Sequence, residues 1–494
     1  MIRRYEDKDI AEKWSNESKL RHWQETELAV IQARANLSHI DAGIPAAIRK
    51  LLEENPIDLE WWLARDKEIN HDLNAFIDER LRFLPVDLQQ YFHSGLTSYD
   101  TEEPAFALML SDSISVFGEH LCLLVQTLEE MAKRYRYTIM NGRTHGQEAE
   151  LQSFGKRCLT WLVALQEGIK GLRSSAENLN YSKLSGAIGN YRGLEGEVEK
   201  EALRILGLTP FYGATQIMPR ELYSSVAHAI CQIVLTLDKI AIDIRLGARS
   251  GRPIYQEPFG RKQKGSSAMP HKKNTIASEQ LEGMARMAKG YLRMIIDNIS
   301  TWEERAIEQS SVERVAWPDL LHVAVHAIKT MTKVLQGLVV YPDHMLAEIV
   351  DSCGCYAAGE AKEFLRQHGA EYGLSAEDAY RIIQLAAFNA FAADEHTKTL
   401  RRNLPESFEE ADSFLLAFRR RPVIKPISIH ETILLGKLAV SEQLEATLEI
   451  VDAWNSLLKR IFSDPNVCEE WNLIFTPSYL LLGEDTLFKE ILGV

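Results

Sequence analysis

The sequence has little of what a nucleic-acid-binding, membrane or secreted protein needs. Acidic residues outnumber basic ones, 70 to 56, and a net charge of -14 disfavours a broad surface for nucleic acid or anionic lipid. No apolar run looks long enough to span a bilayer, and the first residues, Met1 to Asp7, lack the apolar core of a signal peptide. We therefore expect a cytoplasmic protein that binds neither nucleic acid nor membrane. If its ligand is an anion, the attracting field must be local.

Cysteine is also scarce, and its spacing does not indicate a metal site. Only Cys353 and Cys355 are close together, and no Cys-x-x-Cys pair occurs. Two thiols two residues apart could bind a metal in principle, but free and mostly buried thiols are the favoured interpretation. We therefore expect no metal and no cofactor. The six cysteines are Cys122, Cys158, Cys231, Cys353, Cys355 and Cys468.

Glycine and proline gather in one stretch, residues 251–274, where they exclude a continuous helix or strand. The same stretch carries the hydroxyls of Ser266 and Ser267, the ammonium group of Lys272 and the amide of Asn274. A long irregular connection inside a helical chain is more often a functional loop than a plain link. The composition indicates an anion site, although these residues alone also fit a solvated, lysine-rich turn.

Elsewhere the chain has helical periodicity. In residues 219–248, apolar side chains recur every three or four positions, and the segments 104–136, 148–179, 275–300 and 318–338 also read as long helices. Apolar faces of this kind predict that the helices pack into a bundle. The length of these helices suggests that neighbouring subunits share the core. Shorter helices are expected over 11–37, 45–54 and 440–462, with a surface connection over 396–430 and an irregular tail. The prediction is an all-α protein with a helical domain at 1–103, a central bundle at 104–341 containing the loop 251–274, and a helical domain at 342–494.

The motifs between these helices favour a β-elimination. Small and polar residues fill the segments 141–147, 183–190 and 213–216, which include His145 and Gln216. A Ser-His hydrolase is a poor fit, because the Gly-x-Ser-x-Gly elbow is absent and Ser266 is followed by serine and alanine. An elimination needs a base, an acid and fixed cations that hold the developing dianion, and the sequence offers all three.

The segment from Gly265 to Asn274 is similar to the signature of the fumarase/aspartase superfamily, whose members release fumarate from a succinyl group. Within it the chain most resembles the adenylosuccinate lyase family. Further matching motifs run in order to about Asp319, over roughly two thirds of the chain by position. They lie at residues 4–5, 70–72, 93–98, 142–147, 185–189, 215–216, 243–246, 257–260 and 310–314.

The resemblance implies a role for each matched residue. Ser266 is the expected general base, His145 the general acid, and Glu279 the carboxylate partner of the catalytic histidine. Lys272 and backbone N–H groups around Gly265 would stabilise the Ser266 alkoxide. His71 is placed near the phosphate or base. Residues implied in substrate binding are Arg4, Tyr5, Asn70, Asp72, His93, Thr97, Ser98, Thr144, Gln216, Ser267, Asn274, Arg305, Ser310 and Arg314.

The family also implies a homotetramer with a core of twenty helices and active sites built from three subunits. Its substrates are succinylated purine nucleotides or ribotides. Two alternatives remain: another fumarate-releasing lyase of the argininosuccinate lyase type, or a catalytically silent structural homologue. The chain departs from the usual pattern at Tyr99, Leu151 to Ser153, Thr275 and Trp302 to Ala306. None of these changes removes a proposed catalytic group.

Overall fold

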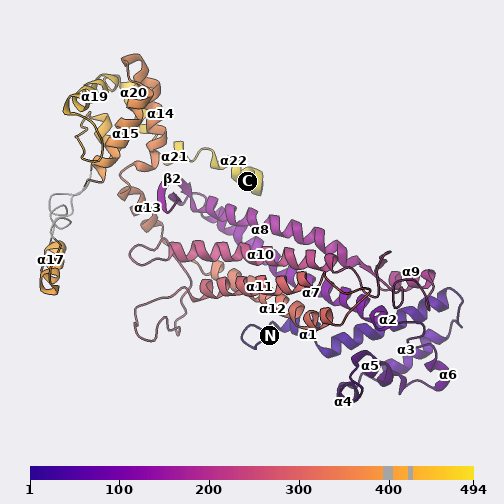
Figure 1. The fold of residues 1–494 in the computed structure, drawn as a ribbon. Coiled ribbons are helices and arrows are strands. Elements are labelled where there is room, and N and C mark those ends of the chain that lie inside the picture. The colour runs from indigo at the N-terminus through magenta and orange to yellow at the C-terminus, as the bar shows by residue number, and fades with distance from the viewer. Residues whose placement is uncertain (393–403, 421–426) are drawn as a thin grey trace. The chain divides into compact units, whose positions relative to one another are not determined.

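The computed structural model describes residues 1–392, 404–420 and 427–494. The chain forms two compact units (Figure 1). Unit 1 comprises Met1–Leu128, Trp161–Arg249 and Tyr255–Val339, and unit 2 comprises Glu129–Thr160, Ser250–Ile254 and Val340–Val494. The described residues are mainly helical, with a few very short sheets, so the all-α prediction is confirmed. The predicted division into three domains is finer than these two units and stays a prediction.

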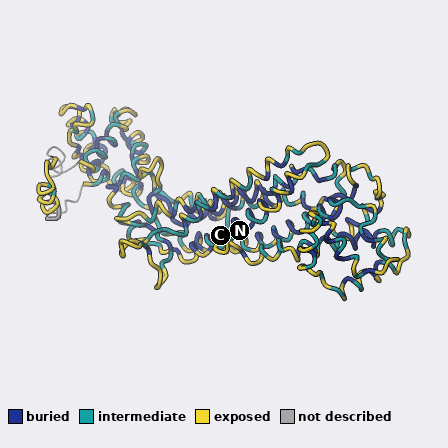
Figure 2. Tube along the Cα trace, turned by 60° about the horizontal axis from the view of Figure 1, so that its bottom comes forward, coloured by how far each residue is buried: buried dark blue, intermediate teal, exposed yellow. Residues whose placement is uncertain are grey.

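The long helices of unit 1 form the expected bundle. They are α7 (Ser98–Arg134), α8 (Phe154–Ala176), α10 (Arg220–Gly247), α11 (Ile276–Asp297) and α12 (Glu308–Gln336), and α10, α11 and α12 pack against one another. On α10 the predicted stripe is buried from Val226 to Ile244, because it faces these neighbours. Buried positions, dark blue in Figure 2, run along these helices.

Three boundaries of the long helices differ from the prediction, and the helix predicted over 440–462 begins only at Leu448. Residues Ile139–Thr144 (β1) and Gln147–Ser153 (β2) form an antiparallel hairpin, so α8 begins at Phe154 and not near 148. Helices α7 and α12 begin well before Pro104 and Pro318, which lie inside them. A proline is most often found in the first turn, and here packing of the flanking residues overrides that preference.

Two helices, α7 and α10, are long and apolar enough to cross a membrane, judged by length and composition alone. The prediction that no run reaches that length is therefore wrong. Such a composition is weak evidence for a membrane span, because the core helix of a soluble protein has it too. In α10, 56% of the apolar window is buried inside the protein.

The N-terminal part of unit 1 packs around Trp23, Phe76 and Phe92. The predicted helix 11–37 is broken at Ser15, whose hydroxyl accepts the N–H of Ser18 and so caps a new helix. The helices here are α1 (Lys8–Lys13), α2 (Asn16–Asn36), α3 (Ile44–Glu54), α4 (Leu59–Ile69), α5 (Asp72–Leu81), α6 (Val86–Gln89) and α9 (Gly196–Ile205). Strands β3 (Tyr181–Ser182) and β4 (Thr209–Pro210) pair in parallel; β5 (Tyr255–Gln256) and β6 (Val339–Val340) are equally short.

Unit 2 has its own apolar core, which includes Ile382, Trp454 and Trp471. The tail beyond 462 is helical and not irregular, because Asp464 caps a helix that starts at Pro465. Of the predicted connection 396–430, residues 396–403 and 421–426 lie outside the described part, and the rest includes α17. The helices are α13 (Pro342–Asp351), α14 (Ala358–Gly369), α15 (Ala376–Ala390), α17 (Phe408–Arg420), α18 (Ile429–Leu434), α19 (Leu448–Ile461), α20 (Pro465–Leu473), α21 (Pro477–Leu480) and α22 (Glu484–Leu492).

Candidate active site

Seven of the predicted site residues line one cavity of about 270 Å³ in unit 1, which we call the polar chamber. They come from the loop between α4 and α5, the start of α7, the segment before α12 and the first turns of α12. The structure thus brings together motifs that lie more than 200 residues apart. The seven are Asn70, His71, Asp72, Ser98, Arg305, Ser310 and Arg314.

Local backbone conformation and helical spacing set the positions of several of these side chains. Asn70 ends α4 in the left-handed region, with φ of 51°, a conformation that asparagine tolerates. The chain then turns at once into α5, where His71 Nδ1 accepts the N–H of Asn74 at 3.2 Å. Ser310 and Arg314 are four residues apart on α12 and share a face. Arg314 Nη2 lies 2.9 Å from Asp72 Oδ2, so the two motifs meet as an ion pair.

Arg305 is held although its surroundings depart from the family pattern. Its guanidinium stacks over the Tyr99 ring, 4.1 Å from the centroid, and its Nη1 donates to Gln216 Oε1 at 3.1 Å. Gln216 Nε2 in turn donates to the carbonyl of Ala187 at 3.2 Å. Gln216 does not line the polar chamber but contacts the arginine that does, and its predicted role in substrate binding stays a prediction.

A buried ion pair fixes the chain beneath the chamber. Lys183 Nζ lies 2.6 Å from Asp100 Oδ1, and both side chains are fully buried. Asp100 also accepts the N–H groups of Thr97, at 2.9 Å, and Gly186, at 3.1 Å. Lys183 donates to the carbonyl oxygens of Gly186 and Gln216. Three of the matched motifs are therefore tied to one charge pair at the start of α7.

A second buried network joins α7, α10 and α12. Arg220 contacts Glu103 at 2.6 Å and Glu313 at 2.8 Å, and Tyr223 donates its hydroxyl proton to Glu103 at 3.0 Å. Burial alone would lower the pKa of Arg220, but the two carboxylates outweigh it and raise that pKa well above its usual value. Glu313 lies between Ser310 and Arg314 in sequence, so this network anchors the turn of α12 that carries both.

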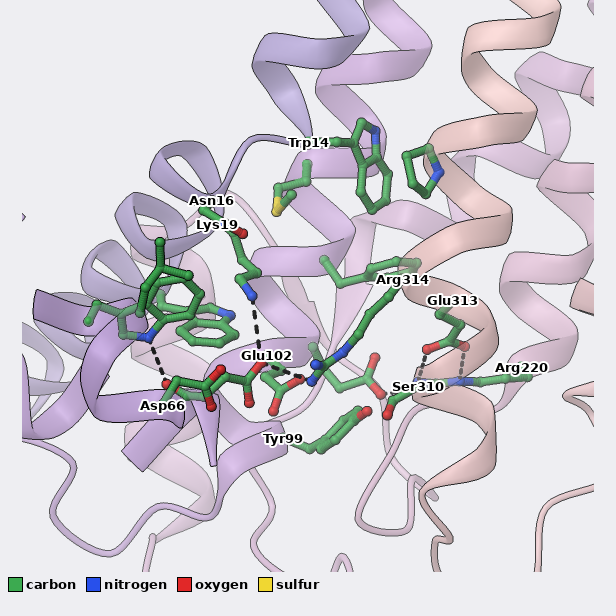
Figure 3. A pocket seen from close by; sticks show the side chains of 18 residues that line it. Trp14, Asn16, Lys19, Asp66, Tyr99, Glu102, Arg220, Ser310, Glu313 and Arg314 are labelled. Carbon is green, nitrogen blue, oxygen red and sulfur yellow. Dashed lines mark hydrogen bonds and ion pairs between the residues drawn. The ribbon is translucent and has the colours of Figure 1, made fainter. Parts of the chain in front are cut away.

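A second cavity of about 400 Å³, the aromatic chamber, adjoins the polar one and shares Asp66, Asp72, Glu102, Ser310 and Arg314 with it (Figure 3). Its apolar lining includes the rings of Trp14, Trp23, Trp62, Tyr99 and Phe106.

Several charged residues of this chamber, Lys19 and Glu102 among them, were missed from the sequence because they stand in no matched motif. Lys19 Nζ lies 4.8 Å and 4.9 Å from the ring centroids of Trp23 and Trp62, and 3.5 Å from Asp72 Oδ2. Burial lowers the pKa of Lys19, and the Asp72 carboxylate opposes that shift.

The signature loop folds back on itself at Gly265. A Cβ there would lie 2.0 Å from the carbonyl oxygen of Lys272, so only glycine fits. Asn274 Nδ2 donates to the Gly265 carbonyl at 2.7 Å and closes the loop. Ser266 Oγ accepts the N–H of Met269 at 3.1 Å and, more weakly, that of Ala268 at 3.4 Å. These N–H groups favour a negatively charged oxygen at Ser266, as the resemblance implies, while Lys272 and Ser267 are exposed.

The start of α11 holds the end of the loop. Glu257 accepts the N–H groups of Ser278, at 2.6 Å, and Ala277, at 3.1 Å, and so caps the helix. In the same first turn, Glu279 lies 3.6 Å from Arg245, and its predicted pairing with a histidine stays a prediction.

His145 and Thr144 lie in unit 2, at the tip of the β1–β2 hairpin, whereas Ser266 lies in unit 1. His145 and Gly146 form a two-residue turn in which both φ values are positive, 53° and 77°. This matches the twist of a hairpin and presents the imidazole at the tip. His145 is exposed, and its ring has no hydrogen-bond or ion-pair partner within the described chain. The expected acid and base are therefore not assembled within one unit.

Other predicted residues also lie away from the polar chamber. The Tyr5 ring packs edge-on against His326 of α12, 5.2 Å away, and Arg4 is exposed beside it. His326 lies sixteen residues beyond Ser310, which is about 24 Å along a helix. His93 Nδ1 lies 2.7 Å from Glu27 Oε1. Burial would lower the pKa of His93, but the Glu27 contact outweighs it and raises that pKa.

Among the described residues, no group of three or more His, Cys, Asp and Glu side chains is placed as around a metal ion.

The comparisons with known proteins fit this geometry. Residues 2–290 match the protein family described as Lyase. Adenylosuccinate lyase from Thermotoga maritima is 35% identical over 396 residues, which cover 80% of this chain and 90% of that protein. Adenylosuccinate lyase from Synechocystis sp. is 34% identical over 391 residues, or 79% of this chain and 89% of the relative.

Solved structures share the fold at lower identity. A fumarate lyase from Mesorhizobium sp. BNC1 aligns with a TM-score of 0.72 at 20% identity, over 95% of this chain and 98% of that one. The 3-carboxy-cis,cis-muconate lactonizing enzyme from Pseudomonas putida gives 0.70 at 20% identity, over 95% and 97%. At this low identity, these similarities show only that the fold is shared. The sequence matches establish that the chain belongs to the lyase family, as an adenylosuccinate lyase homologue of the fumarase/aspartase superfamily.

Proposed function

We propose that this chain is a carbon–nitrogen lyase of purine nucleotide biosynthesis. It splits adenylosuccinate into AMP and fumarate, and the succinyl-aminoimidazole carboxamide ribotide (SAICAR) into the carboxamide ribotide (AICAR) and fumarate. The observation that carries the proposal is the polar chamber, where two guanidinium groups, a serine hydroxyl and the Asn70 to Asp72 turn line one cavity. The relatives named adenylosuccinate lyase support the choice of substrate.

The polar chamber is assigned to the phosphate and ribose of the substrate. Arg305 and Arg314 supply planar sets of N–H donors that suit phosphate oxygens, and Ser310 adds a hydroxyl. Asp66, Asp72 and Glu102 line the same chamber, so the two guanidinium groups are proposed to hold the anion by directed hydrogen bonds and not by a net positive field.

The chemical step is assigned to Ser266 and His145. The Ser266 alkoxide takes the proton from the succinyl carbon next to a carboxylate, and the electron pair moves into that carboxylate as an aci-acid. The pair then forms the double bond of fumarate while the carbon–nitrogen bond breaks, and His145 protonates the departing nitrogen. Thr97, Ser98, Thr144, Lys272, Asn274 and Ser267 are proposed to bind the succinyl carboxylates.

We extend this assignment to more than one copy of the chain, as the family resemblance implies. We propose a cytoplasmic homotetramer in which Ser266, His145 and the Arg4–Tyr5 pair of one site come from different subunits. The placement of Arg4 and Tyr5 about 24 Å along α12 from Ser310, and the exposure of His145, support it. A monomer by light scattering would contradict this assembly.

Fumarate release tests the function directly. Purified protein is supplied in turn with adenylosuccinate, SAICAR and argininosuccinate, and fumarate is quantified by a coupled assay. We expect release from the two purine substrates only. Release from argininosuccinate alone would identify the other lyase, and no release from any of the three would favour a silent homologue.

A further inference from the structure

The carboxyl group of Glu102 occupies an unusual place in this site. It stands one turn into α7 and lines both the polar and the aromatic chamber. Within the described part of the chain it forms neither a hydrogen bond nor an ion pair. Figure 3 shows it in the same part of the cavity as Lys19 and Arg314. Both of these cations form ion pairs with Asp72, at 3.5 Å and 2.9 Å. Asp72 thus takes both cations as ion-pair partners, and Glu102 takes neither within the part of the chain that the structure describes.

Both positively and negatively charged side chains lie close to this carboxyl group. Lys19 of α2 and the two guanidinium groups near α12 favour the ionised form, and Asp72 disfavours it. Burial is the largest influence, and with the nearby Asp72 charge it raises the pKa of Glu102 to about 8. The charged and titratable groups nearby are Lys19, Asp66, His71, Asp72, Tyr99, Glu103, Arg220, Arg305, Glu313 and Arg314.

We infer that the protonation state of Glu102 controls how well the polar chamber binds the phosphate of the substrate. Its neutral carboxylic acid admits the phosphate dianion of the substrate to Arg305, Ser310 and Arg314, and its carboxylate opposes that binding. The inference rests on the proposed function, because it takes the polar chamber as the phosphate subsite.

The chemistry follows from the shared cavity. A protonated carboxyl can donate its O–H to a phosphate oxygen, whereas a carboxylate only accepts and adds a like charge beside a dianion. A phosphate monoester is mainly dianionic above its second pKa of about 6. Binding therefore keeps the proton on Glu102, and above pH 8 the complex takes up a proton that the free site has lost. Loss of affinity with rising pH is the measurable consequence.

Calorimetric titration of the intact protein with AMP tests the inference. We expect the Kd of the wild type to rise by about tenfold from pH 7.0 to 9.0, approaching tenfold per pH unit above the pKa of Glu102, as one linked proton requires. At pH 8.5, titrations in two buffers of different ionisation enthalpy should show uptake of more than half a proton per site. In Glu102→Gln, which is neutral at every pH, Kd should stay within about twofold and uptake should disappear.

The matched control is Asp66→Asn, which removes another carboxylate from the same two chambers. It should keep the pH dependence of the wild type, even if Kd shifts by a constant factor. A Glu102→Gln profile that follows the wild type, or wild-type binding without proton uptake, would overturn the inference.

The proposed function has its own readout. Fumarate release by the wild type with no proton uptake on AMP binding would remove only the role of Glu102. If the wild type neither released fumarate nor bound AMP, the proposed function and the inference would fail together.

Discussion

The two ends of the proposed site are built differently. The polar chamber lies wholly within unit 1 and is tied down by buried charge pairs, such as Lys183 with Asp100 and Arg220 with Glu103. The groups assigned to proton transfer, Ser266 and His145, stand on an irregular loop and on a hairpin tip. The polar chamber is already ordered within unit 1, whereas the groups assigned to proton transfer lie on surface segments.

This difference indicates how the enzyme divides binding from chemistry. A phosphate subsite that is already ordered can bind nucleotide without reorganisation, which lowers the cost of binding. In the proposed assembly, the base and the acid on separate segments would act only when loop and subunits meet over the substrate. Variants in the two regions should therefore affect different measurable quantities.

The largest effect is expected from Ser266→Ala. Removing the base should lower kcat by about 10²- to 10⁴-fold. The Kd for AMP should stay within about twofold, because the polar chamber does not contain Ser266. Stopped-flow turnover and calorimetry give the two numbers.

Its neighbour in the same loop, Ser267→Ala, is the control and should change KM more than kcat. Near-normal turnover in Ser266→Ala would refute its role as the base.

Next in size is the effect of Lys183→Met on stability. The change leaves Asp100 buried without its cation, which should cost about 3–5 kcal/mol in the free energy of unfolding. Adding Asp100→Asn should recover part of this loss. Denaturant unfolding followed by circular dichroism measures it, with the exposed Lys200→Met as control. A loss below about 1 kcal/mol would mean that the pair does not hold the chamber together.

A smaller effect is expected from Arg314→Met. Hydrogen bonds to a charged partner are worth about 1.5–3 kcal/mol, so KM should rise by about 10- to 100-fold. The value of kcat should change only a few-fold, because the group touches the phosphate and not the reacting carbon. Lys333→Met, exposed at the far end of α12, is the control. A fall in kcat with unchanged KM would contradict a role of Arg314 in phosphate binding and would assign it to the elimination step.

The sequence predicted the parts of this comparison that depend on local pattern. Helices α10 and α11 begin and end within a few residues of the predicted segments, because their apolar faces repeat over many turns. The irregular loop around Ser266 followed from its glycines and prolines. The hairpin at 139–153 was missed because two short strands carry a weak period beside the long helix α8.

Contacts between distant segments could not be predicted. Nothing local pairs Lys183 with Asp100 or Gln216 with Arg305, since these partners meet only when the bundle has formed. Glu102 was overlooked for the same reason: two adjacent acids near a helix start look like ordinary helix-dipole partners. Its meaning depends on the cavity that it faces.

The central claim is that the acid and the base of one site come from different copies of the chain. Ser266→Ala and His145→Ala subunits are co-expressed with different tags, and the mixed oligomers are isolated by tandem affinity purification. Half of the subunits retain each group, so about one quarter of the sites should hold both, and about one quarter of wild-type fumarate release should return. Activity no higher than that of the two parent variants would contradict the shared site.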